Sequence, residues 1–105
     1  MAKKMSGSQR ELDIMAFLHR NYLVDEQWVT VGEYARFAQL SKSPYLSSMF
    51  RGLLDEGLIT VQQEPYRATI CYTFALNYEK IEACYPHLKH EMIARVGGWQ
   101  ERLGL

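Results

Sequence analysis

Apolar side chains recur along the chain with two different periods, and each period predicts a different kind of element. At residues 8–23 they repeat every three to four positions, which predicts a first helix, and this spacing returns twice between residues 30 and 57. From residue 58 to residue 76 the period shortens to two, which predicts a β-hairpin. Residues 27–29 form a short strand candidate that could pair with this hairpin.

The first of the two short helices has clear boundary signals. Thr30 can cap it, and Glu33 three residues later completes a capping box that satisfies backbone donors at the helix start. Residues 40–42 would form the turn that follows, with Leu40 facing inward. This arrangement predicts a helix, a tight turn and a second helix.

The second short helix is bounded by a proline and a glycine. Pro44, after Ser43, occupies a first helical position, where a proline costs no hydrogen bond. Gly57 ends the helix, because glycine accepts the left-handed geometry of a C-terminal cap. The stripe expected to be buried comprises Leu46, Met49, Phe50, Leu53 and Leu54.

The opposite face of this second helix carries groups suited to nucleic acid. Its outward side chains are Tyr45, Ser47, Ser48 and Arg51. Short serine hydroxyls let a helix lie close to a phosphate or a base edge, and Arg51 can reach a guanine or a phosphate. Gly52 costs about 1 kcal/mol in a helix interior, so we expect it to permit a close approach by DNA or by a neighbouring helix.

The predicted hairpin ends in a possible DNA contact. Its strands cover residues 58–63 and 68–76, and the tip at residues 64–67 contains Tyr66 and Arg67. Used as a wing, the tip would place Arg67 against a minor groove or a phosphate. The alternative is an ordinary surface hairpin whose arginine is merely solvated. In the return strand the half-buried face comprises Ala68, Ile70, Tyr72, Phe74 and Leu76.

The chain as a whole is neutral, but one segment of it is basic. Lys plus Arg and Asp plus Glu each number 12, so the chain has no net charge at neutral pH. Between Glu33 and Asp55, however, Arg36, Lys42 and Arg51 occur without any acid. A local basic stripe on a neutral protein predicts modest DNA binding by one subunit, which a dimer would strengthen.

The C-terminal segment is the expected place for a dimer interface. Asn77 can cap a helix from Tyr78, Pro86 predicts a break at Tyr85, and residues 97–98 are glycines expected to end the last helix. An apolar stripe could pack on the first helix or on a second subunit, and we expect the second. The stripe comprises Leu88, Met92, Val96, Trp99 and Leu103.

This order of elements is that of a winged helix-turn-helix. Residues 30–59 resemble the DNA-binding segment of MarR-type winged-helix repressors, and compact regulators of the kind found on phages and plasmids are similar in size. The resemblance implies a recognition helix at 43–56, a wing at 64–67 and a symmetric homodimer on a pseudo-palindromic DNA site. The residues that carry it are Thr30, Glu33, Ala35, Leu40, Ser41, Lys42, Ser43, Leu46, Ser47, Leu53, Gly57, Leu58 and Ile59.

The sequence gives less support to a metal site or to a catalytic site. Cys84, His87 and His90 lie three residues apart, but Pro86 interrupts their helix and the cysteines do not form a pair with zinc-finger spacing. We expect no metal and no cofactor, and we expect His19 to be a core-edge histidine rather than a ligand. No glycine-rich phosphate loop or nucleophile elbow occurs, so the chain is not expected to be an enzyme.

The sequence therefore predicts an α+β winged helix-turn-helix protein, with a disordered arm at 1–7, a winged-helix domain at 8–76 and a helical segment at 77–105. We expect it to be cytoplasmic, because no apolar stretch approaches membrane-spanning length. The predicted function is sequence-specific binding of double-stranded DNA as a homodimeric transcriptional repressor. The alternative is a winged helix that binds protein in a replication, partition or phage-assembly complex. The residues predicted to contact DNA are Arg36, Lys42, Ser43, Tyr45, Ser47, Ser48, Arg51, Tyr66 and Arg67.

Overall fold

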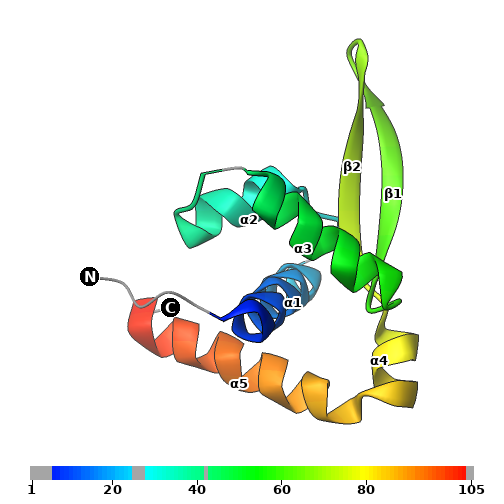
Figure 1. Ribbon diagram of the computed structural model, residues 1–105. Coiled ribbons are helices and arrows are strands. Elements are labelled where there is room, and N and C mark those ends of the chain that lie inside the picture. Colours follow the sequence, from blue (N-terminus) through cyan, green and yellow to red (C-terminus); the bar gives the residue numbers. More distant parts are fainter. Residues whose placement is uncertain (1–5, 25–27, 42, 104–105) are drawn as a thin grey trace.

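The computed structural model describes residues 6–24, 28–41 and 43–103. Within these residues the chain is an α+β protein of five helices and one antiparallel hairpin, which confirms the predicted class. The elements are α1 (Gly7–Leu23), α2 (Val31–Ala38), α3 (Pro44–Asp55), β1 (Ile59–Tyr66), β2 (Thr69–Leu76), α4 (Tyr78–Cys84) and α5 (Pro86–Leu103). Figure 1 shows α1 between α5 on one side and α2 with α3 on the other, while the hairpin extends away from the helices. None of the described helices is both long and apolar enough to cross a membrane.

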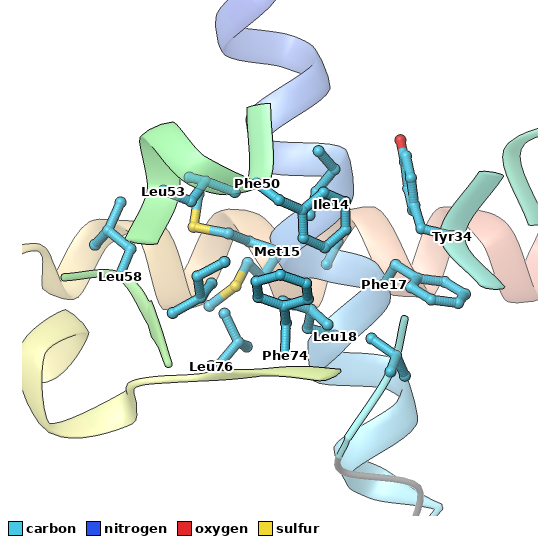
Figure 2. Close-up of a cluster of buried hydrophobic side chains, with 14 of the residues drawn as sticks. Ile14, Met15, Phe17, Leu18, Tyr34, Phe50, Leu53, Leu58, Phe74 and Leu76 are labelled. Atoms are coloured by element: carbon cyan, nitrogen blue, oxygen red, sulfur yellow. The ribbon is translucent and has the colours of Figure 1, made fainter. Parts of the chain in front are cut away.

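Helix α1 is the centre of the hydrophobic core. Ile14 and Leu18 are fully buried, and side chains from α3 and the hairpin surround them, among them Phe50 and Phe74 (Figure 2). Each large apolar side chain that leaves water contributes about 1.5–3 kcal/mol. Because α1 has neighbours on several sides, every residue from Asp13 to His19 is buried.

The predicted boundaries of α2 and α3 follow local backbone signals. The Thr30 hydroxyl accepts a hydrogen bond from the Glu33 backbone N–H at 3.1 Å, which confirms the capping box of α2. Gly57 follows α3 in the left-handed region (φ 77°). Its N–H and that of Leu58 bond back to the last carbonyls of α3, which is the Schellman arrangement.

The start of α1 corrects the predicted disordered arm. The Ser6 hydroxyl caps α1 by accepting from the Gln9 backbone N–H at 3.3 Å, and Gly7 is the first helical residue. The helix therefore begins before the predicted position, because a capping box with Ser6 replaces the unpaired donors there with hydrogen bonds. Residues 1–5 of the predicted arm lie outside the described residues.

The turn between α2 and α3 corrects the placement of Leu40. Gln39 ends α2 in the left-handed region (φ 59°), and the Leu40 N–H then bonds to the Ala35 carbonyl at 2.8 Å. This geometry leaves the Leu40 side chain 38% exposed instead of facing inward. Lys42, also expected in the turn, lies outside the described residues.

The hairpin is longer than the sequence predicts. Strand β1 pairs with β2 from Ile59 opposite Leu76 to Tyr66 opposite Thr69, so residues 67–68 form the turn instead of 64–67. A proline is tolerated at position 65 because β1 is an edge strand in the described part of the chain. Of the strand predicted at 27–29, Val29 makes one antiparallel bridge to β2, and residue 27 lies outside the described residues.

The apolar stripe of α5 packs within its own chain. Met92, Val96 and Trp99 are only 0%, 5% and 6% exposed, and Leu88 is partly buried against the same core. Helix α5 packs against α1, on the side opposite α2 and α3 in Figure 1. These side chains fill the core of their own chain, which corrects their assignment to a dimer interface.

The same packing carries α5 past its expected end. The helix breaks before Pro86, as predicted, but it continues through Gly97 and Gly98 to Leu103. Trp99, just beyond the glycines, contacts Phe37 of α2 with ring centroids 4.9 Å apart. Tertiary packing therefore outweighs the cost of about 1 kcal/mol for each helical glycine.

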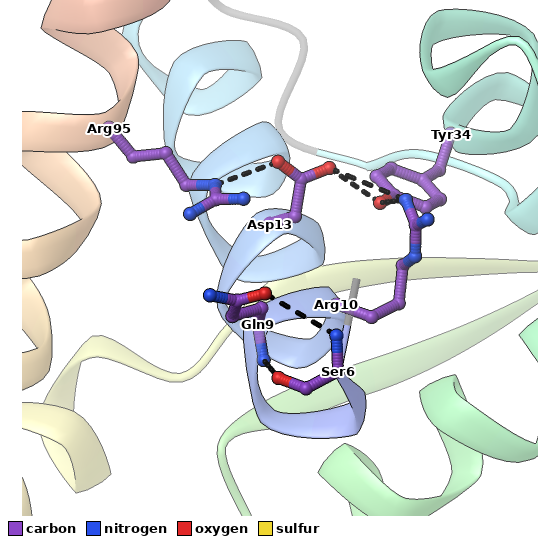
Figure 3. A network of polar contacts seen from close by, with 6 residues as sticks. All are labelled: Ser6, Gln9, Arg10, Asp13, Tyr34 and Arg95. Atoms are coloured by element: carbon purple, nitrogen blue, oxygen red, sulfur yellow. Dashed lines mark hydrogen bonds and ion pairs between the residues drawn. The ribbon is translucent and has the colours of Figure 1, made fainter. Parts of the chain in front are cut away.

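A buried polar network joins α1 to α2 and α5 (Figure 3). Asp13 on α1 accepts hydrogen bonds from the Tyr34 hydroxyl at 2.6 Å and from Arg95 Nε at 2.8 Å. Arg10 donates to the Tyr34 oxygen at 3.0 Å and lies 3.9 Å from the Asp13 carboxylate. Burial, followed by the hydrogen bond to Asp13, raises the pKa of Tyr34, so its hydroxyl remains a neutral donor.

We expect Asp13→Ala to lower the free energy of unfolding by about 3–5 kcal/mol, because it removes the carboxylate that accepts from the buried Tyr34 hydroxyl and from Arg95. Glu82→Ala is a suitable control, since it breaks an exposed ion pair to Lys89 of the same 2.8 Å length. The control should cost less than about 1 kcal/mol. Urea denaturation measures both values, and equal losses in the two variants would contradict a central role for Asp13.

A second polar contact ties α1 to α4. His19 is buried, as expected of a core histidine, and its Nδ1 shares a hydrogen bond with the Tyr78 hydroxyl at 2.8 Å. Burial, and then the charge of Lys89, lower the pKa of His19. Burial and the neighbouring Tyr22 raise the pKa of Tyr78 to about 12. The contact therefore joins a neutral imidazole to a neutral phenol at pH 7.

From the contact between His19 and Tyr78 we predict that the folded protein loses stability in acid. The folded protein holds the pKa of His19 below the ordinary value of 6.5, so its contribution to stability is complete above that pH and declines as the pH falls below it. We expect the unfolding free energy of the wild type to fall more steeply below pH 6.5 than that of His19→Gln, which does not titrate. Parallel urea titrations across this range test the difference, and superimposable pH profiles would argue against it.

Candidate nucleic-acid interface

Helix α3 presents one face to the core and the opposite face to solvent. It begins at Pro44, as predicted, with Ser43 in extended conformation before it. Leu46, Phe50 and Leu53 are buried at spacings of three and four residues. This spacing decides which side chains of the helix face outward.

The outward side chains of α3 are those expected from the sequence. Tyr45, Ser47, Ser48 and Arg51 are exposed, and Ser43 is half-buried at the helix start. Arg51 takes part in none of the ion pairs found between described residues. Its guanidinium is therefore available to an acceptor outside the chain.

The positive character of this face ends before the helix does. Arg36 is exposed in the last turn of α2, whereas the exposed acids Asp55 and Glu56 follow at the C-terminal end of α3. The N-terminus of a helix also carries the positive end of its dipole. The part of α3 from Pro44 to Arg51 therefore carries a basic side chain and no acid.

The tip of the hairpin carries an arginine on a strained backbone. Arg67 is exposed and has φ 58°, in the left-handed region that asparagine and glycine accept more readily. The backbone of Tyr66 pairs with Thr69, but the Tyr66 side chain lies outside the described part of the structure. Of the two side chains predicted to contact DNA from the tip, the position of Arg67 is therefore described and that of Tyr66 is not.

A groove of about 460 Å³ lies between α3 and the hairpin, and we call it the α3–hairpin groove. Ser47 and Arg51 line it from α3, and Val61, Ile70 and Tyr72 line it from the hairpin. The side chains of Val61, Ile70 and Tyr72 are 39%, 57% and 50% exposed, whereas Phe74 and Leu76, on the predicted half-buried face nearer the core, are 8% and 7% exposed. The groove could not be predicted from the sequence. A strand has the same alternation of apolar and polar residues whether its outer half is buried by other elements or exposed to solvent.

Gly52 has no packing role within the described chain. A Cβ atom built at this position meets nothing within 4 Å, so no neighbouring helix requires a glycine there. The residue is exposed on the outer side of α3. Of the two explanations offered by the sequence, close approach of a neighbouring helix is therefore excluded for the described residues.

We expect Gly52→Ala to raise the free energy of unfolding by about 0.5–1 kcal/mol, because alanine loses less backbone entropy in a helix. Gly57→Ala is the matched control, since the left-handed geometry at φ 77° makes alanine costly there. Thermal and urea unfolding should shift in opposite directions for the two variants. A destabilised Gly52→Ala protein would show that an unseen contact occupies that space.

The histidines and cysteines of the C-terminal segment do not assemble into a site. Cys84, His87 and His90 are all exposed. Within the residues that the structure describes, no group of three or more potential ligands lies together, and Cys71 and Cys84 are both free thiols.

Comparison of the chain with protein-family models, with curated proteins and with solved structures found no match. The assignment of a function rests accordingly on the geometry and chemistry of the chain itself.

Proposed function

We propose that this protein is a winged helix-turn-helix DNA-binding protein that acts as a homodimeric transcriptional repressor. Helices α2 and α3 are the helix-turn-helix, α3 is the recognition helix and the hairpin is the wing. The observation that carries the proposal is the outward face of α3, where Ser47, Ser48 and Arg51 are exposed beside a projecting hairpin.

The chemistry of this face suits a DNA groove. A major groove about 12 Å wide admits an α-helix, and an arginine can donate two hydrogen bonds to one guanine. Arg51 takes this role in the proposal, while Ser47 and Ser48 permit a close approach to phosphates. Arg67, at the far end of the hairpin, adds a second contact to the DNA backbone.

A second candidate function is protein binding through the same fold. The apolar wall of the α3–hairpin groove favours it, since Val61, Ile70 and Tyr72 offer nothing to a phosphate. The absence of net charge points the same way, because many DNA-binding domains carry a bulk positive field.

The proposed homodimer requires a surface other than the stripe of α5, whose side chains fill the core. Exposed apolar residues occur at the C-terminal end of α1, where Tyr22, Leu23 and Val24 are 47%, 61% and 62% exposed.

The experiment that tests the proposal is selection of bound DNA from a random duplex library. Enrichment of an inverted repeat, with half-sites about one helical turn apart, would establish a dimeric, sequence-specific protein. Failure to enrich any sequence would leave protein binding as the better candidate.

We expect Arg51→Met to weaken binding of the selected DNA by about 1–3 kcal/mol through loss of a base contact. Arg67→Asn should mainly reduce the salt dependence, because it removes a phosphate contact while asparagine keeps the left-handed turn. Lys80→Gln, on α4, removes one positive charge that the proposal does not assign to the interface, and it should leave affinity almost unchanged. Salt-dependent fluorescence anisotropy measures all three, and unchanged affinity in both arginine variants would disprove the assigned face.

A further inference from the structure

The α3–hairpin groove is apolar at a place where DNA binding alone would call for charge. Its hairpin wall includes Val61, Ile70 and Tyr72, and partly buried Leu54 and buried Phe74 also line it. Phosphates gain nothing from such side chains. Apolar groups gathered in a groove mark a surface that an apolar partner covers.

The electrostatics of the groove narrow the choice of partner. Among its lining residues there is no acid, and Arg51 is the side chain that is charged at neutral pH. Thr30 and Ser47 add hydroxyl groups. A guest that joins a large apolar side chain to a carboxylate matches both the wall and the arginine, since charge-assisted bonds from arginine to carboxylate are strong.

We propose that the α3–hairpin groove binds a short segment of a partner protein in which a large apolar side chain stands next to an aspartate or a glutamate. The apolar side chain lies against Ile70 and Tyr72, and the carboxylate accepts hydrogen bonds from Arg51. The volume of about 460 Å³ falls within the range of about 300–1,000 Å³ typical of binding pockets.

This site has a regulatory consequence that rests on the proposed DNA-binding function. Ser47 and Arg51 belong both to the outward face of α3 and to the groove. A segment seated in the groove occupies the arginine that would contact DNA, so the partner and DNA exclude each other. Peptide binding itself requires no DNA.

The first test is selection of peptides from a random heptapeptide library on the intact 105-residue chain. Peptides that also bind Ile70→Ser are removed by counter-selection. We expect the remaining peptides to share a large apolar residue beside an acid. A basic consensus, or no peptide that depends on Ile70, would overturn the proposal.

The second test measures the best selected peptide by fluorescence anisotropy. Ile70→Ser and Tyr72→Ser should each weaken it about tenfold, through lost apolar burial. Ile93→Ser is the matched control, because Ile93 is similarly exposed on α5 and does not line the groove. Circular dichroism melting confirms that each variant is folded, which is expected since all three residues are at least half exposed.

A double-mutant cycle measures how much the pairing of Arg51 with the peptide carboxylate contributes to binding. Arg51→Met should weaken the acidic peptide about tenfold, while the same peptide with its acid changed to the amide should bind both proteins equally. Equal effects of Arg51→Met on the two peptides would remove the carboxylate from the proposal. Light scattering of the protein alone addresses a different occupant, because a dimer that Ile70→Ser dissociates would make a second copy the guest and overturn the proposal.

The final arm separates this inference from the proposed function. If the DNA selection yields a duplex, the acidic peptide should displace it from the wild type, and simultaneous binding of both would refute the exclusion. If no duplex is selected and the peptide results hold, the groove remains a protein-binding site while the DNA-binding proposal fails.

Discussion

The buried carboxylate of Asp13 is the constraint on which the arrangement of the helices depends. A charge removed from water costs several kcal/mol unless its oxygens are satisfied, and here Tyr34 of α2 and Arg95 of α5 satisfy them at 2.6 and 2.8 Å. Tyr34 and Arg95 are 21 and 82 residues away from Asp13 in the sequence, so the network forms only when the helices have assembled. It fixes α2 and α5 about α1, and α3 takes its position by packing on α1 and α2.

The parts of this arrangement that could be predicted are those governed by neighbours in sequence. The capping box of Thr30, the helix start at Pro44 and the left-handed cap at Gly57 each act within a few residues. The outward face of α3 follows for the same reason, because helical geometry alone puts Ser48 and Arg51 opposite Leu46 and Leu53.

The parts that could not be predicted depend on contacts between distant segments. Asp13 lies in an apolar run, and the sequence does not say which hydroxyl or guanidinium reaches it. The packing of Trp99 carries α5 through glycines that locally favour an end. Likewise, the apolar alternation of β2 is the same for Phe74, which is covered, and for Ile70, which is bare. Phe74 and Ile70 differ in exposure only because the hairpin projects away from the core, so that its base is covered and its outer part is not.

That direction also explains how one small surface comes to hold two kinds of chemistry. The base of the hairpin must be apolar because it closes the core, and the same face continues outward as Val61, Tyr72 and Ile70. Helix α3 meets this face with a polar side, so Arg51 stands where an apolar wall and a polar helix adjoin. In the two proposals, DNA and an acidic peptide both use Arg51, so binding of one partner would exclude the other.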